Sequence, residues 1–170
     1  GNRADDGAGN GLGGAITIAS SGAFTLTNVT LAHNHAAFMG GAVWGGANVT
    51  ARNSLFAYNT AGNPWGQNLH CEKTFAGGGN FQWPLAASDH ACAAGVTTAD
   101  PLLKPLADTI HALPASSPAV DAGGAPCPPN DQRGRARSFD GDGDGLGQCD
   151  SGAYEYIGFD HPSHTSAAPV

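Results

Sequence analysis

The sequence has 170 residues, the size of one domain, with 26 glycines, 11 prolines and only 12% charged residues. This composition, with Thr, Val, Ile and Phe in short segments, predicts short strands and tight turns and argues against a helical protein. The net charge of −7 without a basic stripe argues against nucleic acid as a partner, and no apolar run is long enough to span a bilayer.

The first predicted elements form an internal repeat. Residues 24–34 align with residues 49–59, with apolar positions in register. Two pairs of asparagines also coincide: Asn28 with Asn53 and Asn34 with Asn59. A Gly-Gly-Ala-aliphatic segment occurs at 13–16 and again at 40–43. A period of about 25 residues that contains several short strands predicts one coil of a parallel solenoid.

Within each repeat unit the period-two alternation of apolar residues slips at the first asparagine, which is typical of a corner between two strands. Asparagines stacked at such corners would satisfy backbone groups and form a ladder along the axis. The alternative is that they are ordinary turn residues. The predicted β-helix domain covers residues 1–156, with coils over about 10–100 and a loop-rich cap over about 101–156, and residues 157–170 form a C-terminal tail.

Aromatic and imidazole side chains are the candidate binding residues of the coils. Three tryptophans lie near predicted loops: Trp44, Trp65 and Trp83. Their rings are interpreted either as a surface on which a sugar stacks or as loop side chains that cover the core. His33 aligns with Tyr58 and is expected to point outward, and with His35 it is interpreted as a surface residue. His161 and His164 lie in the Pro/Ser-rich tail, where no preformed metal site is expected.

The four cysteines fall into two local pairs: Cys71 with Cys92 and Cys127 with Cys149. Of the connectivities that four cysteines permit, this one has short loops, and the close spacing of zinc ligands is absent. Two disulfides, each worth roughly 3 kcal/mol, indicate an oxidising compartment; the alternative is free buried thiols. A buried Arg133 in the cap is expected to pair with Asp121 or Asp131, because an unpaired buried charge is too costly.

An acidic loop follows in the cap. Asp140, Asp142 and Asp144 alternate with glycines, as at the start of a calcium loop, where close oxygen ligands need a tightly turned backbone. An EF-hand loop needs a bidentate carboxylate at its twelfth position, and the sequence has Ser151 there, so an EF-hand is excluded. Asp150 could instead complete a calcium site of another geometry. The alternatives are a weakly bound Ca²⁺ ion and a solvated acidic turn, and no other cofactor is predicted.

The charge distribution also bears on catalysis. Between Gly7 and Cys71 the sequence has no Asp or Glu, and Arg52 is the only formally charged residue. Polysaccharide lyases and hydrolases on β-helix scaffolds need carboxylates on the faces of the coils. The sequence therefore predicts that the protein is not an enzyme; a polysaccharide-active enzyme, with its site in the cap, is the least favoured alternative.

Two sets of motifs give the sequence a resemblance to known families. The Gly-Gly-Ala segments, with Leu31-Ala-His-Asn34 and Phe56-Ala-Tyr-Asn59, resemble the GGA(I/L/V) and FxxN repeats of polymorphic outer-membrane proteins and related bacterial surface β-helices. The C-terminal section resembles that of secreted bacterial β-helix proteins described as choice-of-anchor proteins, through four segments: Asp100-Pro-Leu-Leu103, Ser117–Gly123, Asp131–Gly134 and Cys149–Glu155.

The match covers roughly residues 10–156. It implies an all-β, right-handed, single-stranded parallel β-helix with an irregular, disulfide-pinned C-terminal cap, located at a cell surface and without established enzymatic activity. The sequence has only about two and a half coils before the cap, fewer than such proteins usually have. Residues 157–170 also run past the point where the family pattern ends.

These features predict a secreted or cell-surface protein with a structural, adhesive or filament-forming function; the alternative is a carbohydrate-binding module. Asn2-Arg-Ala4 repeats the Asn-x-Ala that closes both repeat units, so residue 1 is expected to enter a coil in its middle and leave an open end. Missing N-terminal coils, or a second copy stacked head to tail with residues 157–170 added as a strand, would cover that end. An uncapped monomer is the third alternative.

Overall fold

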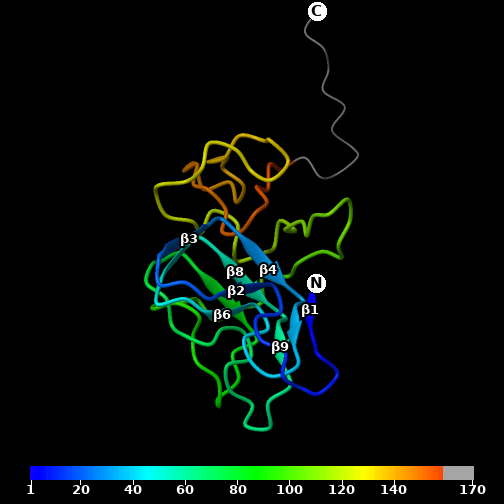
Figure 1. Cartoon of the computed structure of the whole chain (residues 1–170). Coiled ribbons are helices and arrows are strands. Elements are labelled where there is room, and N and C mark those ends of the chain that lie inside the picture. Colours follow the sequence, from blue (N-terminus) through cyan, green and yellow to red (C-terminus); the bar gives the residue numbers. More distant parts are fainter. Residues whose placement is uncertain (159–170) are drawn as a thin grey trace, which may run out of the picture.

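The computed structural model describes residues 1–158 (Figure 1). These residues form no helix, and their strands are two to five residues long. In chain order the strands are β1 (Arg3–Ala4), β2 (Ile16–Ile18), β3 (Ala23–Thr27), β4 (Thr30–Ala32), β5 (His35–Ala36), β6 (Val43–Gly45), β7 (Asn48–Arg52), β8 (Leu55–Ala57), β9 (Thr60–Ala61) and β10 (Phe81–Trp83).

The strands pair in parallel in four small sheets, β1-β5-β9, β10-β8-β4, β2-β6 and β3-β7. Phe24 of β3 lies opposite Val49 of β7, and Leu31 of β4 lies opposite Phe56 of β8. This is the register that the sequence repeat predicts, because each pair is 25 positions apart (49 minus 24, and 56 minus 31). The repeat units therefore lie side by side.

The prediction of a right-handed parallel β-helix is wrong. The short strands form separate sheets of two or three strands, and they build no solenoid. Strands β3, β4, β7 and β8 are each followed directly by a residue with positive φ, and no strand in the repeat exceeds five residues. These residues are Asn28 (50°), His33 (57°), Asn53 (48°) and Tyr58 (56°). Only two units carry the full pattern, and a solenoid needs about three or more to bury a continuous core. The coarser prediction, an all-β chain, is confirmed.

The Gly-Gly-Ala segments lie where two backbones approach closely. A Cβ atom on Gly14 would clash with the carbonyl oxygen of Gly41, and one on Gly41 would clash with that of Thr60. Glycine is the residue that permits such contact, because it has no side chain. The repeated glycines are thus explained by the stacking of the units.

Strand β8 separates two apolar clusters. Phe56 belongs to the first, with Val43, Val49, Cys71 and Phe75. Leu55 belongs to the second, with these residues from β10 and the C-terminal half of the chain: Phe81, Leu113, Ala119, Val120 and Tyr154. Successive side chains of a strand point to opposite faces, so β8 contributes to both clusters. The region of residues 101–158 (green-yellow to red in Figure 1) therefore shares a core with the repeat.

Candidate functional site

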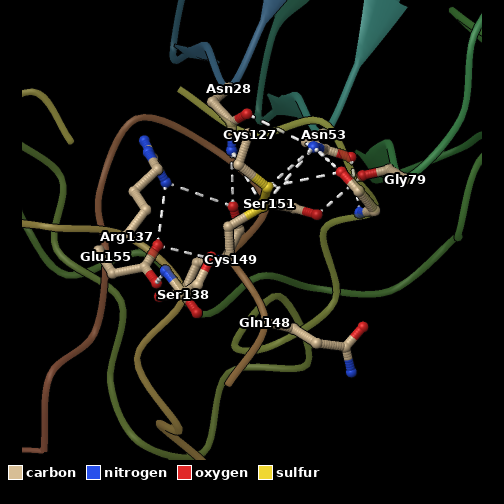
Figure 2. Close-up of a disulfide and its surroundings, with 12 residues drawn as sticks. Asn28, Asn53, Gly79, Cys127, Arg137, Ser138, Gln148, Cys149, Ser151 and Glu155 are labelled. Atoms are coloured by element: carbon tan, nitrogen blue, oxygen red, sulfur yellow. Dashed lines mark hydrogen bonds and ion pairs between the residues drawn. A yellow bond between two sulfur atoms is a disulfide. The ribbon is translucent and has the colours of Figure 1, made fainter. Parts of the chain in front are cut away.

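The two predicted disulfides, Cys71–Cys92 and Cys127–Cys149, are confirmed. Cys71 and Cys92 are both fully buried in the first apolar cluster. Cys149 is buried and Cys127 is half-buried, and their bond lies beside Asn53 (Figure 2). The first disulfide therefore closes a core loop, and the second closes the segment that contacts the corner of the repeat.

The four asparagines of the repeat are buried and lie in two pairs. The backbone N–H and the side-chain Nδ2 of Asn34 both donate to Oδ1 of Asn59, at 3.0 and 2.9 Å. In the other pair, Nδ2 of Asn53 donates to Oδ1 of Asn28 at 3.4 Å. The residues predicted to stack thus contact one another across the repeat.

Asn28 and Asn53 also hold the C-terminal region, a role that the sequence does not predict. Asn53 exchanges two hydrogen bonds with the backbone of Gly124: its Nδ2 donates to the carbonyl at 2.7 Å, and its Oδ1 accepts from the N–H at 2.9 Å. Nδ2 of Asn28 donates to the carbonyl of Asp150 at 2.8 Å, and the N–H of Gly152 donates to the carbonyl of Asn53 at 2.7 Å. The corner of the repeat is therefore one attachment point for this region, in addition to the shared apolar cluster (Figure 2).

A buried ion pair lies next to this attachment. Nη1 of Arg137 is 3.1 Å from Oε2 of Glu155, and the two side chains are 3% and 0% exposed. Nη2 of Arg137 donates to the carbonyl of Gly152 at 2.9 Å, and Oε1 of Glu155 accepts from the N–H of Ser138 at 2.7 Å (Figure 2). Every charged group of the pair has partners, which is the condition for burying charge.

Of the two partners predicted for Arg133, Asp121 and Asp131, the structure shows Asp131. The guanidinium lies 2.8 Å from the Asp131 carboxylate, and 3.7 Å above the ring of Tyr154. Burial raises the pKa of Asp131, but hydrogen bonds from the backbone N–H groups of Glu155 and Arg135 and from Arg133 together bring it below its ordinary value. Its charge therefore stabilises the folded region.

Asp150 is fully buried, and its environment differs from that of Asp131. Its carboxylate accepts hydrogen bonds from the backbone N–H groups of Asp121 at 2.9 Å and Tyr156 at 2.5 Å. These bonds favour the charged form, but burial is the larger effect and, with the nearby charge of Glu155, raises the pKa of Asp150 to about 7.

The raised pKa of Asp150 predicts a pH dependence of stability. The folded state holds the proton more tightly than the unfolded chain, so the stabilisation from Asp150 is present below about pH 4 and lost as the pH rises through about 7. We expect the free energy of unfolding of the wild type, relative to that of Asp150→Asn, to fall over this interval. Urea denaturation at a series of pH values measures it, and parallel curves for the two proteins would contradict the assignment.

The acidic loop brings together part of the predicted calcium set. Carboxylate oxygens of Asp140 and Asp142 lie within 4.8 Å of one another and of Asp121. Asp121 was not predicted, because it lies in a separate segment without a spacing motif. Asp144 accepts from the N–H of Leu146 at 2.7 Å, and Asp150 is turned into the core, so neither is part of this cluster.

Backbone N–H groups already use several of these oxygens. Oδ2 of Asp121 accepts from Gly141 and Asp142, and both oxygens of Asp140 accept from the loop. Calcium would therefore compete with the hydrogen bonds that shape the loop. The donor set is all oxygen, which suits calcium, but the competition favours weak binding.

We expect added calcium to raise the melting temperature, as a ligand specific to the folded state does. With a dissociation constant of about 1 mM, calcium at about 10 mM would stabilise the protein by about 1.4 kcal/mol. Asp142→Asn keeps the oxygen that accepts from the N–H of Asp144 and removes the charge, so it should abolish the shift. Calorimetry of the wild type and of Asp142→Asn, with calcium and with chelator, measures these melting temperatures. An unchanged melting temperature of the wild type would contradict calcium binding and support the solvated acidic turn.

A surface hollow of mixed character lies beside Trp44 of β6. Its volume is about 390 Å³, and its lining combines an aromatic ring, hydroxyls and both signs of charge: Ile18, Ser20, Ser21, Trp44, Glu72 and Lys73. Oε2 of Glu72 accepts from the N–H of Gly45 at 3.1 Å and lies 3.8 Å from Nζ of Lys73. A second hollow of about 370 Å³ shares Gly46, Ala47 and Lys73 with the first, so the two adjoin over the β6–β7 turn.

The other two tryptophans do not line these hollows. Trp65 is 60% exposed, and its ring meets that of Phe38 edge-on, with centroids 5.7 Å apart. Trp83 is half-buried at the end of β10. Of the three predicted stacking residues, Trp44 is therefore the one that lines this hollow together with charged and hydroxyl side chains. Glu72 and Lys73 were missed because no sequence signal ties them to Trp44.

No protein-family model, curated protein or solved structure matches this chain. The resemblance to bacterial surface β-helices therefore stays a prediction. Within residues 1–158 there is no helix that could cross a membrane.

Proposed function

We propose that this chain is an extracellular surface-interaction protein that binds through the hollow beside Trp44, with a saccharide as the ligand class. The observation that supports it is the Trp44 hollow itself, where one half-buried aromatic ring lies beside a carboxylate, an ammonium and two serines. An aromatic face packs against the C–H groups of a sugar, and the polar groups pair with its hydroxyls. The two disulfides are compatible with an extracellular location.

A larger hollow of about 550 Å³ lies beside Arg133 and Tyr154. The guanidinium of Arg133 already pairs with Asp131 and stacks on the ring of Tyr154. A ligand there would have to break these contacts, so the Trp44 hollow is the better candidate.

The proposed function is binding without catalysis. Supporting this, Asp131, Asp150 and Glu155 serve as buried hydrogen-bond acceptors for the backbone of the C-terminal region. Head-to-tail assembly, with adhesive or filament-forming activity, stays a prediction from the sequence, because residues 159–170, most of the tail on which it depends, lie outside the described residues.

Glycan-array binding followed by calorimetry tests the saccharide proposal. We expect Trp44→Ala to weaken binding of any saccharide found by at least about tenfold, since burying an aromatic side chain is worth about 1.5–3 kcal/mol. Trp65→Ala is the matched control, because Trp65 is exposed and lies outside the hollow. Absence of any bound glycan, or equal loss in both variants, would contradict the proposal.

A further inference from the structure

Two histidines from distant parts of the sequence meet at the surface. His33 follows β4, and His111 lies in the C-terminal half; their ring centroids are 5.3 Å apart and their planes are tilted by 40°. His33 is exposed and His111 is half-buried, so both rings are accessible from solvent. The sequence predicted an outward-pointing His33, but nothing in it connects that residue to His111.

The His33 ring is oriented by an aromatic neighbour in the repeat. It stacks on Tyr58, its counterpart in the repeat, with centroids 4.7 Å apart and an interplanar angle of 16°. The two residues share a left-handed backbone conformation, with φ of 57° and 56°, and this shared geometry sets their rings in parallel. The hydroxyl of Tyr58 donates to Asp100, which also accepts from the N–H of Leu102 at 2.8 Å.

The His111 ring is oriented by the backbone. Its Nδ1 lies 2.9 Å from the carbonyl oxygen of Lys104. Since a carbonyl only accepts hydrogen bonds, Nδ1 carries the proton, and the lone pair of the neutral ring is on Nε2. Metal-binding histidines in proteins have this arrangement, with the second nitrogen donating to a carbonyl or a carboxylate.

We propose that His33 and His111 form a two-histidine site for a divalent transition metal, which would join the repeat to the C-terminal region. Two imidazole nitrogens suit Cu²⁺, Ni²⁺ and Zn²⁺ better than Ca²⁺ or Mg²⁺, and Cu²⁺ binds tightest in this series. The remaining coordination positions are open to water. This site is separate from the acidic loop and from the Trp44 hollow, and it does not depend on the proposed function.

Copper titration of the full chain tests the site, with calorimetry for affinity and electron paramagnetic resonance for nitrogen ligation. We expect a single Cu²⁺ bound with a dissociation constant in the micromolar range and nitrogen hyperfine structure. His33→Ala and His111→Ala should each weaken binding by at least about tenfold and reduce the nitrogen signal. Without metal, the melting temperatures of both variants should stay close to that of the wild type, because both rings are accessible at the surface.

Two control variants locate the binding. His35→Ala should retain it, because the imidazole that lies beside His33 is that of His111, whereas the His35 ring contacts Thr60 of β9. The double variant His161→Ala, His164→Ala should also retain it. Absence of copper binding in the wild type, retention in His33→Ala or His111→Ala, or a loss that follows His161 and His164 would each overturn the proposal.

Discussion

Replacing Arg137 with alanine is expected to lower the free energy of unfolding by about 3–5 kcal/mol. The substitution leaves the carboxylate of Glu155 buried, with 0% exposure, and without its counter-ion. It also removes the donor to the carbonyl of Gly152. The loss exceeds the value of the pair itself, because an uncompensated buried charge bears its full desolvation cost. Urea denaturation of the wild type and the variant measures it.

Arg3→Ala is the matched control for this prediction. Arg3 also pairs with a carboxylate, that of Asp5, but its side chain is 63% exposed. Water screens such a pair, so its removal should leave the stability nearly unchanged. Equal effects of the two substitutions would show that Arg137 and Glu155 do not stabilise the C-terminal region.

Removing the Cys71–Cys92 disulfide with two alanines is expected to cost more than removing Cys127–Cys149. The sequence separations are 21 and 22, so the loop-entropy contribution is about 3 kcal/mol for each. Cys71 and Cys92 are also both fully buried in the first apolar cluster, where the lost sulfur atoms leave a void. That void adds about 1–2 kcal/mol. Cys127 is half-buried, and water can fill its place.

Thermal and urea unfolding of the two double variants under identical conditions measures this difference. We expect both variants to fold, with the variant that lacks Cys71–Cys92 the less stable of the two. The reverse order would indicate that the second disulfide supports more of the fold than its burial implies.

The part of the fold that the sequence predicts is its local pairing. Apolar positions and asparagines at one offset specify which residues of β3 and β7, and of β4 and β8, lie opposite. The architecture was predicted wrongly because a strand register does not determine how many strands a sheet has. After β9 the described chain adds a single further strand, β10, so the sheet β10-β8-β4 ends at three strands, and the irregular C-terminal region packs on the side chain of Leu55.

The candidate sites show the same limit. The disulfides and the Arg133–Asp131 pair were predictable, because their partners lie close in the sequence or are required by the cost of burying charge. Asp121 in the acidic cluster, and His111 beside His33, were not predictable, since only the folded chain brings them to their partners. The second role of Asn53, as the attachment point for Gly124, gives no local sequence signal either.

The contacts of Asn28, Asn53 and Leu55 imply that the C-terminal region and the repeat form one cooperative unit, which native-state hydrogen exchange can test. The N–H of Gly152, bonded to the carbonyl of Asn53, and that of Asp150, bonded to Glu155, report on the attachment. The N–H of Leu55, bonded to the carbonyl of Val29, reports on the repeat. We expect one opening free energy for all three N–H groups, equal to that of global unfolding. Exchange of Gly152 and Asp150 through an opening of much lower free energy, with Leu55 still protected, would contradict it.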